Sequence, residues 1–485
     1  MPVPPVLGGA HGTAMIRTGI ALPCRPEWTV SDSARSAAPQ GLNIVRRWLS
    51  VMTVVCWALA LGARLAVAAN GGPTHRILMT YWSDNVSGFA GYPMPGSSAP
   101  SGATQTNQQM QRQLDAINVL AYAFLQVDAA GDVYFADPAL DLSTADLRHF
   151  CAQHPTACPH PASASAGSFA AFARLTNRYH SLLKIASIGG AGSQSTLDNA
   201  LNHRKSFVRS AVSLIHAYHL DGLDLDFEPD AFFGPRQGEQ YAELVVALRR
   251  QLVGQAFISI EVPGDWETLR SIDCSSDSRC KDNLALIAGD AYISLMGYDY
   301  HGPLYPGAVT GSDSNLYSDP HEPLLAGFYH VSDNQAVEYL TFMGVPADRI
   351  LLGFPAYFVC YGGVVAAPGS HGLYQPFDRS LTKIYDLGEL KGVGSDRFAR
   401  RLLDAGFRPH RLLIGGKLSA VYAYSASSQE WMSYDNAASI AAKADYVIAR
   451  HLGGMMMWEI GEDMPVDNPR SLLGSAHRVL FGAEP

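Results

Sequence analysis

The chain has 485 residues, of which 47 % are hydrophobic and 16 % are charged, and this composition is typical of a folded globular protein and excludes a disordered one. Its formal net charge is −9, which makes it a poor partner for nucleic acid or anionic membrane surfaces, because these bind clustered Lys and Arg. Length alone permits two or three domains, although α/β barrels of about 250 residues or more form single units.

The first 69 residues differ in kind from the rest. Arg46 and Arg47 precede the apolar run 48–61, and Ala66-Val67-Ala68 follows. This order is typical of a secretory signal peptide, and the run is short for a membrane span; a membrane anchor and a buried core helix are the alternatives. We therefore expect residues 1–69 to be a leader and residues 70–485 to be secreted without stable membrane association. The leader holds six Arg and two acids, so its removal changes the net charge to −13.

Cysteine spacing agrees with export. The mature chain keeps two close pairs, Cys151 with Cys158 and Cys274 with Cys280, and a fifth residue, Cys360. Neither pair has C-x-x-C spacing, which favours two small disulfide loops in an oxidising compartment. For the first pair a zinc site is the alternative, because several histidines lie nearby. We expect Cys360 to be a buried thiol.

Apolar runs of strand length recur from residue 70 onward, and helical periodicity separates several of them. Eight such runs predict a closed (β/α)8 TIM barrel, with an open doubly wound sheet as the alternative. No phosphate-binding glycine motif supports the open sheet. The predicted strands are Ile77–Tyr81, Ile117–Phe124, Leu183–Ile188, Leu223–Phe227, Phe257–Val262, Tyr292–Met296, Ile350–Phe354 and Met455–Trp458, and the predicted helices include Phe207–Tyr218, Tyr241–Leu252, Ala336–Met343 and Ala437–Leu452.

The fourth predicted strand carries a row of acids in the segment DGLDLDFEPD, residues 221–230. Strand residues two apart lie ~6.6 Å apart on one face, so Asp224, Asp226 and Glu228 share a face opposite the apolar residues between them. The apolar face suits the helical layer, which predicts that the acids line the barrel interior toward its carboxyl-end mouth.

A row of buried carboxyls cannot be fully ionised near neutrality, because like charges and desolvation each raise a carboxyl pKa. Glu228, the outermost, is therefore the predicted general acid. A calcium loop is disfavoured, because the glycine and glutamate that it requires are missing from the expected positions. A metal-holding D-x-D and a purely structural row of acids are the remaining alternatives, and we predict neither a metal nor another cofactor.

At these residues the chain resembles family 18 of the glycoside hydrolases, which includes the chitinases. The family signature D-x-x-D-x-D-x-E matches Asp221, Asp224, Asp226 and Glu228. Further family motifs follow in order: S-x-G-G at 187–190, M-x-Y-D at 296–299, G-x-P-x-Y at 353–357 and a late S-Y-D at 433–435. The resemblance spans about residues 74–465, and it implies a possible small α+β insertion after the seventh strand, at 358–418.

The resemblance implies a retaining mechanism in which the N-acetyl group of the substrate acts as the nucleophile. In that mechanism Glu228 is the acid and base, Asp226 orients the acetamido group, Asp224 tunes Asp226, and Tyr298 binds the acetamido carbonyl. Trp458 forms the floor beneath the sugar. Further residues implied in substrate binding are Tyr81, Phe124, Met296, Asp299 and Tyr357, and other aromatic residues that could line the groove are Trp82, Trp266 and Trp431.

The expected protein is thus a secreted chitinase whose partner is chitin or a chitooligosaccharide. Alternatives are an endo-β-N-acetylglucosaminidase, a hydrolase of peptidoglycan-type glycans and a chitin-binding lectin; the intact Glu228 argues against the lectin. Two family aromatics are replaced here, by Ala191 and by Pro229-Asp230, which predicts a missing sugar platform. The sequence does not indicate an oligomeric state.

Overall fold

The structure is a computed structural model that describes residues 76–83, 107–142, 169, 172–230, 232–252, 256–274, 281–302, 308–323, 330–386 and 406–482. The predicted signal segment and Cys151, Cys158 and Cys280 lie outside these ranges, so the signal peptide and both disulfides remain predictions. Cys360 is buried. No helix within the described ranges has the length and apolarity that crossing a membrane requires.

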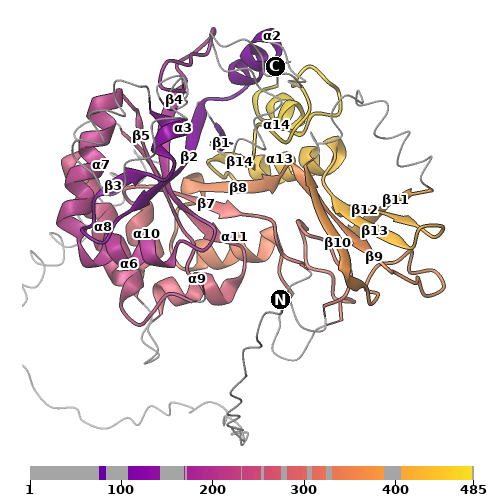
Figure 1. The fold of residues 1–485 in the computed structure, drawn as a ribbon. Coiled ribbons are helices and arrows are strands. Elements are labelled where there is room, and N and C mark those ends of the chain that lie inside the picture. The colour runs from indigo at the N-terminus through magenta and orange to yellow at the C-terminus, as the bar shows by residue number, and fades with distance from the viewer. Residues whose placement is uncertain are drawn as a thin grey trace, which may run out of the picture. The chain divides into compact units, whose positions relative to one another are not determined.

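Eight parallel strands form a closed barrel, as the eight apolar runs predict (Figure 1). Neighbouring strands pair in parallel around the ring, and β1 closes it by pairing with both β14 and β2. A short antiparallel strand, β3 (Val133–Phe135), extends β2 outside the ring. The barrel strands are β1 (Ile77–Ser83), β2 (Val119–Val127), β4 (Leu183–Gly190), β5 (Gly222–Phe227), β6 (Phe257–Pro263), β7 (Tyr292–Met296), β8 (Ile350–Pro355) and β14 (Gly454–Trp458).

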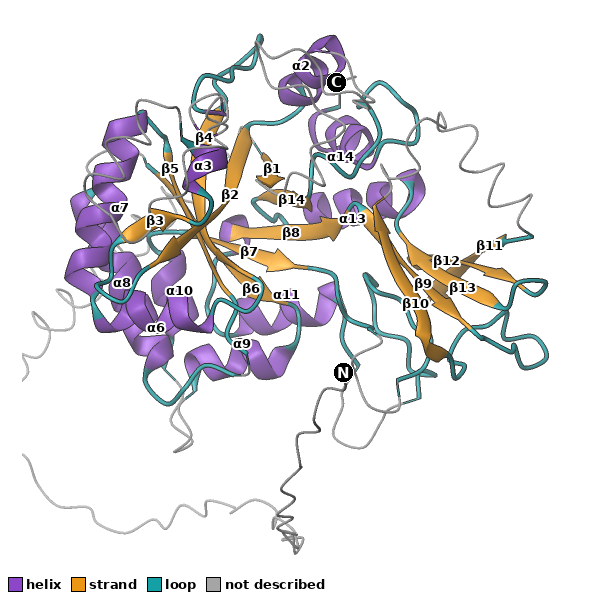
Figure 2. Ribbon diagram, in the orientation of Figure 1, coloured by secondary structure: helices purple, strands orange, loops and turns teal. Residues whose placement is uncertain are grey.

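Helices follow most of these strands and cover the outer face of the barrel (Figure 2). The predicted helical segments are confirmed, with ends shifted by a few residues. Local capping explains where α13 begins: Asn436 accepts hydrogen bonds from Ala438 N and Ser439 N, in a capping box with Ser439. The helices are α2 (Asn107–Asp115), α3 (Pro138–Asp141), α6 (Gln194–Asn202), α7 (Arg204–Tyr218), α8 (Gln237–Gln251), α9 (Trp266–Asp273), α10 (Asn283–Ala288), α11 (Asp333–Phe342), the 3-10 turn η3 (Ala347–Arg349), α13 (Ala437–Ala449) and α14 (Leu472–Phe481).

A second sheet follows β8 along the chain and is antiparallel throughout, in the order β10-β9-β13-β12-β11. Its strands are β9 (Tyr357–Gly362), β10 (Asp378–Asp386), β11 (Arg408–Ile414), β12 (Lys417–Ser425) and β13 (Glu430–Tyr434). The segment 358–418, predicted as an insertion, contributes to this sheet, which continues to residue 434. Leu316 N donates to Ser419 O at 2.9 Å, so the sheet is also tied to the connection after β7.

Buried apolar residues form two clusters on opposite faces of the barrel strands. The larger cluster joins outward residues such as Leu223 and Phe227 to helical residues such as Phe207 and Tyr241. The smaller one fills the barrel interior and continues onto one face of the second sheet, where Tyr422 and Trp431 belong to it. One face of the second sheet therefore shares a core with the interior of the barrel.

Candidate active site

The acids of β5 alternate with apolar residues, as period-two geometry predicts. Leu225 and Phe227 face the helices: Tyr241 O–H donates to Leu225 O at 3.0 Å, and the Phe227 ring lies 5.4 Å from that of Tyr241. Asp224 and Asp226 point inward and are 0 % and 4 % exposed. Glu228 follows the end of the strand and is half-buried. The row therefore rises from the closed interior to the mouth of the barrel, and we name Asp224, Asp226 and Glu228 the acid ladder.

Asp224, the lowest acid, lies among hydroxyl donors. Ser187 of β4 donates to its Oδ2 at 2.7 Å, and Ser259 of β6 donates to its Oδ1 at 2.6 Å. The Tyr81 hydroxyl lies 3.0 Å from the same Oδ2. Burial raises the pKa of Asp224 to about 6, and these hydroxyls oppose the rise because they stabilise the ionised form.

Glu261 of β6 is a further acid in this interior, and the sequence reasoning missed it. It is 3 % exposed, and its Oε1 lies 2.6 Å from the Tyr81 hydroxyl. Burial raises its pKa well above the usual range, and the charge of Asp224 raises it further. The available signal was the alternation Ile258-Ser259-Ile260-Glu261-Val262, which places Ser259 and Glu261 on one inward face.

The two glycines that end β4 allow the close approach of other groups to the ladder. A Cβ on Gly189, at φ +131°, would lie 1.9 Å from the Asp226 carbonyl oxygen. A Cβ on Gly190, at φ +96°, would lie 2.8 Å from the ring of Phe124. Residues with a side chain disfavour such positive φ values. The S-x-G-G motif thus combines a hydroxyl for Asp224 with space for Asp226 and Phe124.

Asp226 occupies the middle of the ladder. Its Oδ1 is buried without a hydrogen-bond partner among the described residues. Burial raises its pKa well above the usual range, and the charges of Glu228, Glu261 and Asp224 add to the rise. A buried carboxyl of this kind retains a proton or loses it in concert with its neighbours.

Glu228 stands at the top of the ladder, and Ser193 holds its backbone. Glu228 N donates to Ser193 Oγ at 2.8 Å, and Ser193 O–H donates to Asp226 O at 3.3 Å. Burial raises the pKa of Glu228 to about 7, and the charge of Asp299 acts in the same direction. A half-buried carboxyl with this pKa retains its proton near neutrality, as a general acid requires.

The end of β7 and the segment after it carry three further predicted site residues, Met296, Tyr298 and Asp299. Tyr298 is buried, and its hydroxyl lies 4.0 Å from Met456 Sδ. Tyr357 O–H donates to Asp299 Oδ1 at 2.6 Å. Met296, the last residue of β7, is half-buried. Burial raises the pKa of Tyr298 well above its usual range, and the charges of Glu261 and Asp226 raise it further.

Aromatic rings lie beside the ladder at the ends of β1, β2 and β14. Phe124 and Trp458 are half-buried and stacked, with centroids 5.5 Å apart and planes 10° apart. Tyr81 packs against Trp458 with centroids 5.2 Å apart, but Tyr81 is only 1 % exposed. The half-buried pair retains accessible ring surface, whereas Tyr81 contacts the acids beneath it.

The other aromatics differ in exposure. Trp82 and Trp431 are 2 % and 0 % exposed, so they belong to the packed interior. Trp266, the first residue of α9 after β6, is half-buried.

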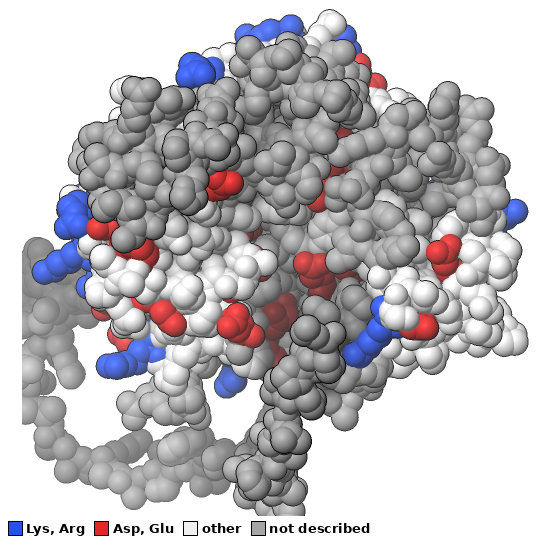
Figure 3. All heavy atoms as spheres, in the orientation of Figure 1, with Lys and Arg blue, Asp and Glu red and all other residues white. Residues whose placement is uncertain are grey.

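Acidic side chains are visible near the centre of the face in Figure 3, where the surface is hollowed, and most basic ones lie toward its edge.

A second buried polar group lies behind β7, and we name it the lysine cluster: Lys443, Asp333, Asp435 and Ser314. Lys443 Nζ lies 3.1 Å from Asp435 Oδ2 and 3.7 Å from Asp333 Oδ2, and it also donates to Ser314 Oγ. Ser314 O–H in turn donates to the carbonyl of Gly297 at 2.6 Å. The S-Y-D motif therefore supplies Asp435 as an ion-pair partner on the far side of the β7 end.

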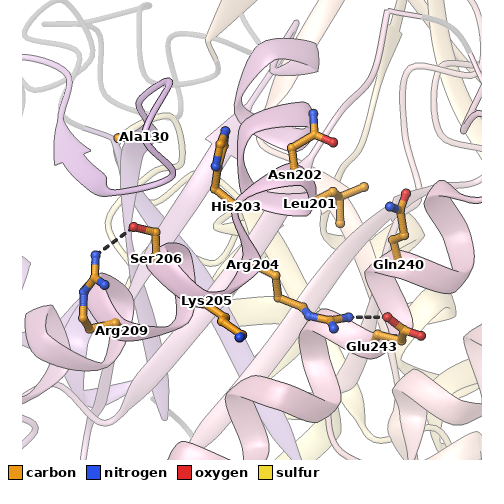
Figure 4. Close-up of a pocket in the computed structure, with 10 residues that line it drawn as sticks. All are labelled: Ala130, Leu201, Asn202, His203, Arg204, Lys205, Ser206, Arg209, Gln240 and Glu243. Atoms are coloured by element: carbon orange, nitrogen blue, oxygen red, sulfur yellow. Dashed lines mark hydrogen bonds and ion pairs between the residues drawn. The ribbon is translucent and has the colours of Figure 1, made fainter.

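Figure 4 shows a hollow of about 570 Å³ between the first turn of α7, the end of α6 and α8. Two of its cations already have partners: Arg204 pairs with Glu243, and Arg209 with Ser206 and Asp132. None of the predicted site residues lines it. Within the described ranges His, Cys, Asp and Glu form no group suited to hold a metal ion.

A closed parallel barrel with acids at the carboxyl end of one strand is typical of barrel enzymes. The chain belongs to the glycosyl hydrolases family 18, whose sequence model matches residues 98–463. This confirms the family resemblance and the barrel.

Known relatives span more than one kind of protein. Chitinase 1 of Aphanocladium album is 27 % identical over 289 residues, which cover 57 % of this chain and 60 % of the relative. The oviduct-specific glycoprotein of Ovis aries is 24 % identical over 316 residues, covering 60 % and 52 %. The chain therefore spans little more than half the length of these relatives, and family membership alone does not fix an activity.

Solved structures share the fold at lower identity. Chitinase ChiA74 from Bacillus thuringiensis matches with a TM-score of 0.62 and 20 % identity, over 85 % of this chain and 70 % of that one. A group IV chitinase from Ostrinia furnacalis matches with a TM-score of 0.61 and 21 % identity, over 84 % of this chain and all of the other.

Proposed function

We propose that the chain is a chitinase that hydrolyses β-1,4 linkages between N-acetylglucosamine units. The observation that carries the proposal is the acid ladder: it ends in Glu228, a half-buried carboxyl with a pKa raised to about 7. Tyr81, which contacts Asp224 of the ladder, also packs on Trp458, and Trp458 stacks on Phe124. Sugar rings stack on aromatic faces, and a protonated carboxyl at that point can reach a glycosidic oxygen. Relatives support the substrate class: one matching structure is a chitinase in complex with allosamidin and another a chitinase domain in complex with (NAG)5.

The proposed mechanism is retaining and substrate-assisted. The carbonyl oxygen of the substrate's acetamido group attacks its own anomeric carbon while the Glu228 proton passes to the leaving oxygen. Asp226 orients the acetamido N–H and balances the positive charge of the oxazolinium, and Tyr298 binds the acetamido oxygen. Ionised Glu228 then takes a proton from the water that opens the intermediate. The configuration at the anomeric carbon is therefore retained.

Export is part of this proposal. It is supported by the paired Arg46 and Arg47, the apolar run after them and the small-residue segment at 66–68. Mass analysis of the exported protein should show a mature N-terminus near residue 70. An exported chain that began before residue 60 would contradict the proposed cleavage.

The deciding experiment is product analysis with chitin tetramer and hexamer, with the anomeric form of the products followed by NMR. We expect cleavage with retention, and no cleavage of oligomers that lack the N-acetyl group. Binding of the oligomers without hydrolysis would indicate a lectin, and hydrolysis of the de-N-acetylated oligomers would exclude substrate assistance. Parallel assays on N-glycan cores and peptidoglycan glycans separate the related hydrolase activities.

A further inference from the structure

The contacts of Tyr81 carry information about where one proton resides. Its hydroxyl oxygen lies 2.6 Å from Glu261 Oε1 and 3.0 Å from Asp224 Oδ2. A phenol has one hydrogen to donate. Both contacts can be full two-centre hydrogen bonds only if one of the two carboxyls carries a proton and donates it to the phenol oxygen.

The surroundings of the two carboxyls decide which of them carries that proton. Asp224 accepts from Ser259 at Oδ1 and from Ser187 at Oδ2, and donors at both oxygens favour an ionised carboxylate. Glu261 is fully buried, with Tyr81 at 2.6 Å. The consistent arrangement is a chain in which Glu261 O–H donates to Tyr81 Oη and Tyr81 O–H donates to Asp224 Oδ2.

Strand register places Glu261 at the side of Asp226. Leu225 and Ile260 are Cα partners on β5 and β6, so the next residues on the two strands, Asp226 and Glu261, lie at the same height. On the other side of Asp226 the partner is Gly189, which has no side chain. Glu261 is therefore the carboxyl that lies beside Asp226 at the same height in the barrel, and a negative charge on Glu261 would act directly on Asp226.

We propose that Glu261 is a positioning residue that stays protonated at working pH, holds Tyr81 and Asp224 in one hydrogen-bonded chain, and lets Asp226 ionise beside the substrate. The kinetic part of this inference rests on the proposed function. Groups that act on Glu261 from the barrel interior are Tyr81 of β1, the acid ladder of β5, Ser294 of β7 and Tyr298, while Tyr241 of α8 lies on the helical side of β5. None of these is a cation, so an ionised Glu261 would add a third unbalanced negative charge beside ionised Asp224 and Asp226.

Infrared difference spectroscopy of the full chain tests the proton directly and needs no substrate. We expect wild type at pH 7.5 to show the C=O stretching band of a buried protonated carboxyl that is missing from Glu261→Gln. Unfolding of the variant is excluded by matching circular dichroism spectra. Identical spectra of the two proteins in this region would overturn the proposal, whether or not the chain hydrolyses chitin.

Chitooligosaccharide kinetics test the positioning role. Glu261→Leu keeps an apolar side chain of similar volume but loses the donor to Tyr81, and we expect kcat to fall about 10- to 100-fold through misplacement of the ladder. In Glu261→Gln the amide N–H replaces the proposed O–H donor, so most of the lost kcat and the wild-type pH profile should return. Tyr81→Phe should resemble Glu261→Leu.

Two outcomes would overturn the positioning role. One is a Glu261→Gln variant as slow as Glu261→Leu, because rescue requires a donor at this position. The other is a pH profile displaced in Glu261→Gln, because that would mean that the wild-type residue titrates in the working range. A wild-type chain inactive on every glycan would refute the proposed function instead, and the infrared result would then decide the protonation of Glu261.

Discussion

The acid ladder and the lysine cluster are both buried and rich in carboxyls, yet they differ in how charge is balanced. In the lysine cluster an ammonium lies within 4 Å of two carboxylates. Within the part of the chain that the structure describes, no lysine or arginine forms an ion pair with the ladder or with Glu261, and hydroxyl groups are the donors there.

The difference separates a structural group from a reactive one. Burial lowers the pKa of Lys443, but Asp435 and Asp333 raise it by more, so the lysine stays charged. Burial raises the pKa of Glu228 to about 7, and no cation among the described residues opposes the rise, which places its titration near neutrality. In the lysine cluster the ion pairs hold Asp435 and Asp333 in place, although burial still raises the pKa of Asp333 to about 7. The ladder carboxyls have no such ion pair among the described residues, which favours a role in proton exchange.

Glu228→Gln tests whether the acid ladder is the reactive group. The amide cannot donate the proton that the leaving group requires, so we expect kcat on chitin hexamer to fall about 10²- to 10⁴-fold with little change in stability. Glu267→Gln on α9 is the matched control and should retain wild-type activity. Hydrolysis by Glu228→Gln at the wild-type rate would remove Glu228 from the mechanism.

The lysine cluster is tested by Lys443→Met. Loss of the ammonium leaves Asp333 and Asp435 buried without their cation, and we expect the free energy of unfolding to fall by about 3–5 kcal/mol in urea titrations. Lys205→Met, at an exposed position on α7, should change it by less than about 0.5 kcal/mol. Equal stability of the two variants would mean that the cluster is not a structural ion pair.

The pH dependence of kcat/KM tests whether the raised pKa of Glu228 governs activity. In the proposed mechanism Glu228 acts as an acid, so activity requires the protonated form and is lost as pH rises through its pKa. With that pKa raised to about 7, kcat/KM on chitin tetramer should fall about tenfold per pH unit well above neutrality. A descending limb that began near pH 4.5, the ordinary value for a glutamate, would show that burial does not shift Glu228.

Two serine-to-alanine variants, one in each polar group, should change stability only slightly. Ser187→Ala removes a hydroxyl donor from Asp224, and Ser314→Ala removes the hydroxyl between Lys443 and Gly297. Each should lower the free energy of unfolding by about 1 kcal/mol. Only Ser187→Ala should also move the pH profile, because only its partner belongs to the ladder. An equal shift of the pH profile in both variants would mean that the acid ladder and the lysine cluster do not differ in their link to activity.

Alternation and chain order were sufficient to predict most of the fold and the ladder. The eight barrel strands follow from near-continuous apolar runs, because strands covered on both faces are apolar on both. Period two places Asp224 and Asp226 on one face, and the apolar residues on the opposite face, which suit the helical layer, give the inward direction.

What the sequence did not predict depends on contacts between distant segments. Glu261 is a single acid in an otherwise apolar run, and its importance appears only when Tyr81 approaches from β1. Lys443 resembles an ordinary surface lysine on a helix, yet α13 buries it to 1 % exposure against α11. Tyr81 was expected to bind sugar, and no sequence pattern indicated that its hydroxyl contacts Asp224 and Glu261 from β1 while its ring packs on Trp458.

Closure of the barrel by β14 has a consequence for biosynthesis. Residues 454–458 fill the gap between β1 and β8. A nascent chain whose residues 454–458 are still inside the ribosome therefore exposes the unpaired edges of both strands. Open edges invite pairing with other chains. Newly made molecules are therefore most vulnerable to aggregation until the segment that also supplies Trp458 emerges, and translation pauses shortly before it should increase misfolding.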